Sequence, residues 1–570
     1  MNNLVTVVDS RPKAAERPER IILFTYYLPG AFLLAFCLAY LYEAYTFAVD
    51  FPFMDDTSLL RLIYEIRKAD APAQVLHSFF VSDNDHRIVI PRLVAFVDYL
   101  LNGRLHFKAY IVLANGNVLL ILLLLYKRFK ALSLPLFYFL PVPLLLLQFQ
   151  YHEVNNWALT GLQHTSLCLF ALLISGILYS TESTAGFVLA LLLAVASTFT
   201  HGNGITTFGI GLYLLASRRK FQWFGYWLLA LLLCLLGYLW GYSFSGEASS
   251  PRRALSVFSL FFGLIGANFT IVSDSSSVAS IAWGLLLFLG VTPFILLNFY
   301  RSLAGEKKPL SATSVIFADF TFLFLTVSMI AFFRAQETVI VPNRFKLYAA
   351  VCSALAYLLI LRITARSYRN YVYAGLLCLC VFFNGLCFLH YTRAILLKRS
   401  QYVADTYNWK HHFHMVSIPF QFNANAQYYL RPAYQEGYWH LPDYLPGADQ
   451  SLKRAKLLPV RPKTYTIREG EHVYRIIEAP ITEFRHRALT NEVLFALIHQ
   501  STGKTYLTGG LPQRAAYRRM LTEGSVYSGI YSAKFATSTL PPGRYRVGLL
   551  YAETARSRPE AVLFDGFISW

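Results

Sequence analysis

Charged residues are scarce in this chain of 570 residues: they make up 15%, whereas hydrophobic residues make up 55%. A soluble protein of this size would carry about 25% charged residues. The apolar residues recur in runs of about 17 to 25, the length that a helix needs to cross a bilayer. The shortage of charge excludes an ordinary soluble protein and predicts a polytopic α-helical membrane protein.

Cysteine is also scarce, and all seven cysteines lie in hydrophobic runs. Because the last third of the chain has none, it holds neither a disulfide framework nor a cysteine metal site. The chain has no glycine-rich nucleotide-binding loop, and its net charge of +19 comes without a nucleic-acid-binding motif. We therefore expect no cofactor and no nucleic-acid partner, although a divalent metal at Asp and His side chains stays open.

Basic residues indicate how the chain crosses the bilayer. The polar tail 1–20 is expected in the cytoplasm, followed by an uncleaved first span at about 21–47. Placing the other basic clusters in the cytoplasm leaves eleven full crossings, because 88–102 and 253–275 then do not cross. The further spans are expected near 109–126, 131–149, 164–180, 184–200, 205–216, 222–241, 280–299, 313–333, 346–361 and 371–392. The prediction is a domain over 21–395 with about 11 to 13 transmembrane or re-entrant helices, in contact with the bilayer.

The composition changes near residue 393. Residues 396–460 are rich in Tyr, Trp, His and Pro with little periodicity, which predicts an irregular connector. Residues 461–570 hold short alternating runs separated by Gly, Pro and Asn turns, which predicts a β-sandwich-like domain. With the basic clusters inside, this domain lies outside the cytoplasm.

The first outer loop, 48–87, is the most informative polar segment. It begins with the pair Asp55-Asp56, and a carboxylate at headgroup height could act as a base toward an acceptor hydroxyl. The alternative is structural, because Asp is a favoured cap and an amphipathic surface helix is expected at 57–68. Capping by one Asp does not exclude catalysis by the other.

The same loop ends in a dense polar sequence just before an apolar run. A charge near lipid is costly and normally paired, so these residues are either a mutually paired helix cap or part of a binding site. In the second interpretation Asp85 or His86 lies beside a sugar and Arg87 contacts a phosphate. The residues are Asp83, Asn84, Asp85, His86 and Arg87.

Three more outer segments carry candidate binding residues. Amides and an aromatic face suit a sugar at 148–163, although an ordinary loop with an interfacial Trp is the alternative. Arg344 could hold a phosphate, or could simply reach the interface from a helix end. Glycines near 201–204 allow close backbone approach or form a plain turn. The candidates are Glu153, Asn156, Trp157, Gln163, His201, Asn203 and Arg344.

These features resemble the GT-C superfamily of integral-membrane glycosyltransferases, which includes protein mannosyltransferases and lipid A aminoarabinose transferases. The likeness rests on the uncleaved first span, the acidic pair in Met54-Asp55-Asp56, the many spans and the outer C-terminal domain. It implies that Asp55 is catalytic, although Glu is common where this chain has Asp56. A closer likeness is to uncharacterised bacterial members with an Asn-(Glu/Asp)-His-Arg motif, which here is Asn84 to Arg87.

The resemblance covers roughly residues 20–400 and leads to a functional hypothesis. A sugar would pass from a polyprenyl-phosphate donor to a glycan, lipid or protein acceptor at the outer face of a bacterial inner membrane. Asp55 would be the base, Asp56 or Asp85 would position the acceptor, and Arg87 and Arg344 would hold the phosphate. The alternatives are a transporter or flippase of lipid-linked saccharide, and a polysaccharide-binding membrane scaffold.

Overall fold

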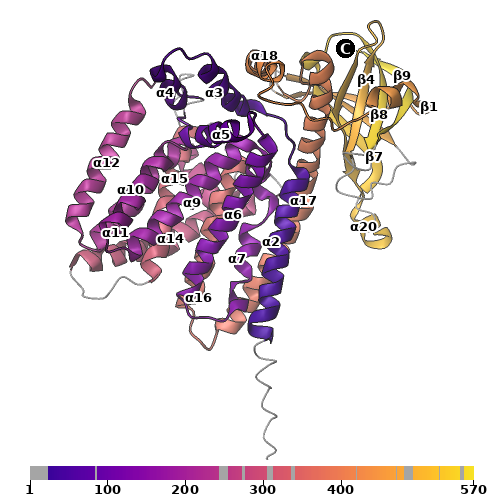
Figure 1. Ribbon diagram of the computed structural model, residues 1–570. Helices are drawn as coiled ribbons and strands as arrows, with labels where there is room; N and C mark the ends of the chain where they lie inside the picture. The colour runs from indigo at the N-terminus through magenta and orange to yellow at the C-terminus, as the bar shows by residue number, and fades with distance from the viewer. Residues whose placement is uncertain are drawn as a thin grey trace, which may run out of the picture.

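The structure is a computed structural model that describes residues 23–83, 86–242, 254–271, 277–304, 312–335, 341–418, 420–469, 472–480, 492–524, 527–552 and 558–569. It contains a large helical part and a C-terminal β domain, joined by one long helix (Figure 1). The predicted cytoplasmic tail and two predicted site residues, Asn84 and Asp85, lie outside the described residues.

Eight helices of the described chain are long and apolar enough to cross a membrane, as a multi-pass membrane protein requires. Three further apolar helices are shorter: α10 (Thr184–Thr198), α11 (Phe208–Ser217) and α13 (Ala254–Ile265). The eight long helices are α2 (Leu28–Phe47, with the preceding turn η1, Leu23–Tyr27), α6 (Phe107–Lys130), α9 (Ala158–Ser180), α12 (Phe221–Leu239), α14 (Val278–Ala304), α15 (Ala312–Arg334), α16 (Lys346–Ile363) and α17 (Arg369–His412).

Two of the expected spans are not continuous long helices. The segment 131–149 is divided into η3 (Leu136–Phe139), α7 (Pro141–Leu146) and η4 (Phe149–Tyr151). Pro135, Pro141 and Pro143 divide it, since proline lacks the N–H of a helix interior and clashes with the preceding turn. The expected span 205–216 begins as the 3₁₀ turn η5 (Gly202–Thr207) and leaves only ten residues for α11.

The first loop forms short helices at the upper end of the helical part in Figure 1, which we call the upper end. They are η2 (Met54–Asp56), α3 (Thr57–Arg67) and α4 (Pro72–Phe80), followed by α5 (Val89–Asn102). With 14 residues, α5 is about 21 Å long, shorter than a hydrocarbon core of about 30 Å. This length agrees with the expectation that 88–102 does not cross.

The basic clusters gather at the opposite, lower end. Arg218 and Lys220, at the end of α11, pair with Glu182 in the α9–α10 turn. Arg219 donates to the carbonyls of Ser302 and Leu303 at the end of α14. These basic residues therefore pair with acceptors at the lower end of the helical part.

Helix α17 extends well beyond the predicted span 371–392. Its 44 residues correspond to a length of about 66 Å. No proline or glycine occurs between Gly385 and His412, so the helix continues where an irregular connector was expected. The rest of that connector is also partly helical, with α18 (Phe420–Gln435) and α19 (Ala448–Lys453).

The β domain consists of two packed sheets, as the alternating runs predicted. One sheet has the strand order β1-β9-β8-β4-β5 and the other β2-β3-β7-β6. Side chains of both sheets share one core, for example Ile477, Phe495, Phe535 and Leu549. The elements are β1 (Lys456–Leu458), β2 (Lys463–Glu469), β3 (His472–Pro480), β4 (Glu492–His499), β5 (Thr505–Gly509), β6 (Leu511–Arg514), α20 (Tyr517–Glu523), β7 (Tyr527–Ala536), η8 (Thr537–Thr539), β8 (Arg544–Ala552) and β9 (Glu560–Ser569).

The five-stranded sheet also packs against α17, so the β domain is joined to the helical part over an extended contact. Asn408 in α17 donates to the carbonyl of Leu507 in β5 at 2.7 Å and accepts from the N–H of Leu507 at 2.8 Å. The buried Arg399 donates to Glu492 at 2.6 Å and to the carbonyl of Thr46 in α2. The domain is therefore held to both the first and the last long helix.

Candidate functional site

The acidic pair of the first loop divides into a buried and a partly exposed carboxylate. Asp56 is buried, accepts from the N–H of Phe53 at 3.0 Å and accepts from the N–H of Leu159 at 2.7 Å. It thereby fastens the loop to the first turn of α9. Asp55 is half-buried and directly precedes it. Asp56 makes no side-chain cap hydrogen bond to α3, the helix that it was expected to cap, and instead fixes the turn η2 and the start of α9.

Burial raises the pKa of Asp56 to about 7, although the N–H groups of Phe53 and Leu159 act in the opposite direction. Asp55 adds to the increase because a second negative charge nearby is unfavourable. The residue before the pair, Met54, has a φ of 44°, in the left-handed region that non-glycine residues rarely adopt. Backbone strain of this kind concentrates at functional sites.

Lys398 of α17 lies beside this pair in a cage of three aromatic rings. Its Nζ is 4.9 Å from the ring centre of Phe53, 5.1 Å from Trp157 and 5.8 Å from Tyr402. Such cation–π contacts stabilise an ammonium group with little water around it. The negative charges of Asp56 and Glu153 also interact with Lys398. Helix α17 therefore supplies a cation to the first loop.

Glu153 and Arg344 extend the cluster from two other segments. Glu153 belongs to α8 (His152–Asn156), and Arg344 lies in the 3₁₀ turn η7 (Asn343–Phe345). The backbone N–H of Arg344 donates to Glu153 at 3.2 Å, and the guanidinium lies 3.5 Å from the same carboxylate oxygen. Arg344 also acts on the charge of Lys398, which places these residues in one electrostatic group.

Three histidines continue the group toward the end of the first loop. The ring centres of His86 and His201 are 4.3 Å apart, and those of His201 and His164 are 4.8 Å apart. Burial and the neighbouring His86 and His164 hold the pKa of His201 well below its usual value. Arg334 and Arg344 lower the pKa of His201 further, because their positive charges disfavour a protonated imidazole nearby.

Three buried polar atoms have no hydrogen-bond partner within the described residues, and two of them belong to the aromatic cage of Lys398. They are the indole N–H of Trp157, the hydroxyl of Tyr402 and the side-chain carbonyl of Asn156, which precedes Trp157 in the chain. Leaving a buried polar group unpaired costs about 1–3 kcal/mol, so the fold usually avoids it. These atoms are therefore available to a polar ligand.

A small cleft beside α2 borders Asn156, and its enclosed volume is about 10 Å³. The half-buried Glu43 lies at one wall, one turn before the end of α2. The lining residues come from α2, α6, η4, α8 and α17: Tyr40, Glu43, Ala44, Phe47, Asn115, Phe149, Asn155, Asn156 and Ile395. Its enclosed space has room for about one water molecule.

The remaining predicted residues are placed differently. Arg87 is buried and donates to the carbonyls of Phe80, Tyr238 and Trp240, so its guanidinium holds backbone at the upper end. The backbones of Asp83 and His86 exchange two hydrogen bonds of 2.8 and 2.9 Å. Gln163 and Asn203 are buried, and the N–H of Asn203 donates to the ring of His201 at 3.2 Å.

Sequence reasoning missed Lys398, and it noted His164 among the polar residues near 148–163 without making it a site candidate. Lys398 falls where a connector was expected, and only continuation of the helical period through 393–412 would have indicated its direction. His164 directly follows Gln163 at the start of an expected span, and an ionisable residue there is by default a functional candidate.

The donor set is suited to anions and hydroxyls more than to metals. Among the described residues, no group of three or more His, Cys, Asp and Glu side chains is arranged to hold a metal ion. The cluster instead offers a half-buried carboxylate, an ammonium, a guanidinium, neutral imidazoles, amides and aromatic faces. These groups can accept a proton from a hydroxyl and stabilise a phosphate.

Comparison of the chain with protein-family models, with curated proteins and with solved structures found no match.

Proposed function

We propose that the protein is an integral-membrane glycosyltransferase of GT-C type, which uses a polyprenyl-phosphate-linked sugar as donor. One observation carries the proposal: carboxylate and cationic side chains from four separate segments meet at the upper end of a helical part with eight apolar helices. The segments are the first loop, α8, η7 and α17. A lipid phosphate and a sugar hydroxyl are the chemistry that this combination serves.

In the proposed reaction an acceptor hydroxyl attacks the anomeric carbon of the donor sugar with inversion. Asp55 takes the hydroxyl proton while the bond from the anomeric carbon to the phosphate oxygen breaks. Lys398 and Arg344 stabilise the negative charge that the leaving polyprenyl phosphate keeps. Asp56 does not take part directly, because both of its oxygens accept backbone N–H groups that fix the loop.

The structure bears differently on the roles that the sequence suggested for Asp85 and Arg87. Asp85 lies outside the described residues, so its proposed positioning of the acceptor rests on the sequence alone. Arg87 contacts three backbone carbonyls, which favours a structural role. We therefore assign the contact with the phosphate to Lys398 instead. The site would face the outer side of a bacterial inner membrane, since the basic clusters lie at the other end.

The test is a transfer assay with the purified full-length protein in lipid nanodiscs. Undecaprenyl phosphate carrying labelled glucose, mannose, galactose or aminoarabinose is supplied as donor, with a bacterial envelope extract as acceptor. We expect at least one donor to lose its label to acceptor or to water. Asp55→Asn should abolish that loss, whereas Asp70→Asn, an exposed carboxylate of the same loop, should not.

Two results would overturn parts of the proposal. If a folded wild-type protein released label from none of the donors, the transferase assignment would fail. If transfer occurred but Asp55→Asn retained the wild-type rate, Asp55 would not be the base.

A further inference from the structure

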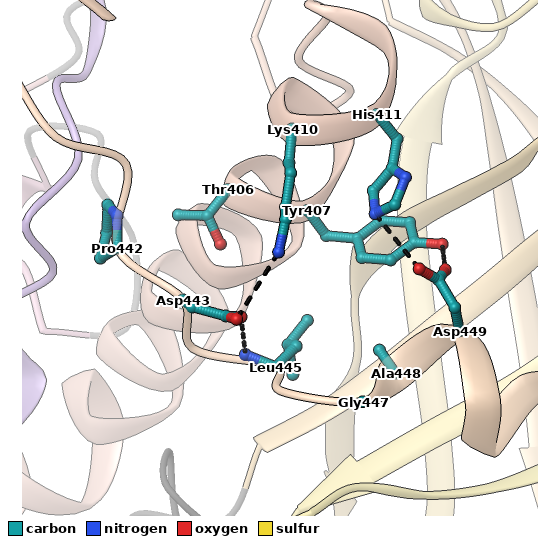
Figure 2. A pocket seen from close by; sticks show the side chains of 10 residues that line it. All are labelled: Thr406, Tyr407, Lys410, His411, Pro442, Asp443, Leu445, Gly447, Ala448 and Asp449. Atoms are coloured by element: carbon teal, nitrogen blue, oxygen red, sulfur yellow. Dashed lines mark hydrogen bonds and ion pairs between the residues drawn. The ribbon is translucent and has the colours of Figure 1, made fainter. Parts of the chain in front are cut away.

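A second pocket lies away from the cluster, where α17 meets the loop 442–449 beside the β domain (Figure 2). Its enclosed volume is about 50 Å³, and it opens to solvent. Five lining residues carry its chemistry: Tyr407, Lys410 and His411 from α17, Asp443 from the loop, and Asp449 from the first turn of α19.

The charged side chains of this pocket point toward one another across its opening in Figure 2. Lys410 Nζ lies 3.5 Å from Asp443, and His411 Nε2 lies 3.6 Å from Asp449. The hydroxyl of Tyr407 donates to Asp449 at 2.5 Å. About half of the side-chain surface of Lys410, Asp443 and Asp449 is exposed, so these pairs are weak and can exchange partners with a ligand.

The composition of the pocket narrows the chemistry of its ligand. Two carboxylates face one ammonium, which disfavours a phosphate or another anion. The polar lining disfavours a lipid tail. The ring centres of Tyr407 and His411 are 4.2 Å apart with the rings tilted by 35°. Tyr407 is buried, so the aromatic surface of the pocket is that of the partly exposed His411. A saccharide offers all the matching groups. Its hydroxyls can donate to the carboxylates and accept from the ammonium, and its C–H face can pack on an aromatic ring.

We infer that this pocket binds a saccharide, and that its bound sugar is part of the acceptor glycan. The second half of the inference rests on the proposed glycosyltransferase function. It is supported by the connection between pocket and cluster through α17, where Lys398 and Lys410 are twelve residues and about 18 Å apart. A short oligosaccharide could span that length.

The pocket loop also contacts the beginning of the first loop directly. The hydroxyl of Tyr444 accepts from the backbone N–H of Asp50 at 3.0 Å. The ring centres of Phe51 and Trp439 lie 5.8 Å apart with the rings edge to face. The segment that carries Asp443 is therefore joined to the segment that leads into Asp55.

The test measures saccharide binding without any donor, on the full-length protein in detergent, by saturation-transfer NMR. The probes are glucose, galactose, mannose, N-acetylglucosamine and their disaccharides. We expect saturation transfer to at least one probe, and at least tenfold weaker binding for the double variant Asp443→Asn/Asp449→Asn. The matched control is Asp565→Asn, an exposed carboxylate 3.8 Å from Arg461 elsewhere on the β domain, which should bind as wild type does.

Two results would overturn the inference: a folded protein that binds none of the probes, or binding that the double variant leaves unchanged. Binding of the diamine putrescine that the double variant abolishes, with no sugar binding, would identify an amine site instead. Because no donor is present, this experiment tests saccharide binding independently of sugar transfer. Binding without transfer would contradict only the proposed reaction.

Discussion

The helical part holds a buried charged group toward each end, and the two groups differ in how their hydrogen bonds and charges are paired. Toward the lower end, Arg128 of α6 donates to Asp319 of α15 at 3.2 Å. It also donates to the carbonyl of Leu172 and the hydroxyl of Ser175, both at 2.8 Å, and Ser175 donates to Asp319. This network is complete within the protein.

At the upper end, Lys398 contacts ring faces, and polar atoms of Trp157, Tyr402 and Asn156 have no partner among the described residues. A buried ion pair that is complete in itself needs nothing from outside. A cluster that leaves polar groups unpaired carries a free-energy cost that the fold alone does not recover. The difference indicates that the lower network supports structure and the upper cluster supports ligand binding.

The largest effect is expected for Asp55→Asn, which changes the upper cluster only. Loss of a positioned base reduces a rate by about 10² to 10⁴, so sugar transfer should fall by that factor. The free energy of unfolding should hardly change, because Asp55 is only half-buried. Initial rates of label transfer and thermal unfolding of the same preparation measure both. A loss of transfer that only mirrored a loss of folded protein would contradict the prediction.

Asp319→Ala should have the opposite profile. Removing one partner of a buried ion pair leaves Arg128 uncompensated and costs about 3–5 kcal/mol. Thermal unfolding in detergent should show a lower transition temperature. The control is Glu182→Ala at the same end, where the carboxylate is exposed and pairs with Arg218 and Lys220, and it should change the transition little. Equal effects of the two variants would remove the distinction between a buried and an exposed network.

Lys398→Met compared with Arg128→Met tests the contrast between the two cations. Methionine fills the aromatic cage without a charge, so the unfolding transition should stay near wild type. Affinity for undecaprenyl phosphate, measured by native mass spectrometry, should fall about tenfold, which corresponds to about 1.4 kcal/mol. Arg128→Met should lower the transition temperature clearly. A destabilised Lys398→Met with unchanged lipid affinity would assign the lysine to structure.

Asp56→Ala should act on stability rather than on the reaction, and the size of its effect should depend on pH. The pKa of Asp56 is raised from 3.8 to about 7, so the folded protein binds its proton more tightly than the unfolded chain. The resulting stabilisation is complete below about pH 4 and declines until about pH 7. The variant should lose a cap worth about 0.5–2 kcal/mol, with a loss that is larger at pH 4 than at pH 8. An identical loss at both pH values would show that burial does not hold the proton there.

Much of the fold could be predicted from the sequence, because hydrophobic period and turn chemistry act locally. The long apolar runs, the short helix 88–102 and the alternating strands after 461 are all found. Predictions failed where helix-breaking residues were given too little weight, and where the absence of such residues was overlooked. Prolines divide 131–149, whereas their absence lets α17 continue through 393–412.

The candidate site was predicted only in part, for a physical reason. The sequence identified Asp55, Asp56, Glu153, Trp157 and Arg344 as polar residues at helix ends. It could not show which of two adjacent aspartates caps the loop, because that depends on the N–H of Leu159, more than a hundred residues away.

The sequence by itself determined that this chain is rich in apolar helices and that a β domain follows. These properties depend on composition and on periods of 3.6 and 2 residues, which are visible within short segments. Only the tertiary structure brought Lys398 to the first loop, brought three histidine rings together and formed a pocket between α17 and the segment 442–449. Such contacts join residues far apart in the chain, and packing of the whole molecule decides them.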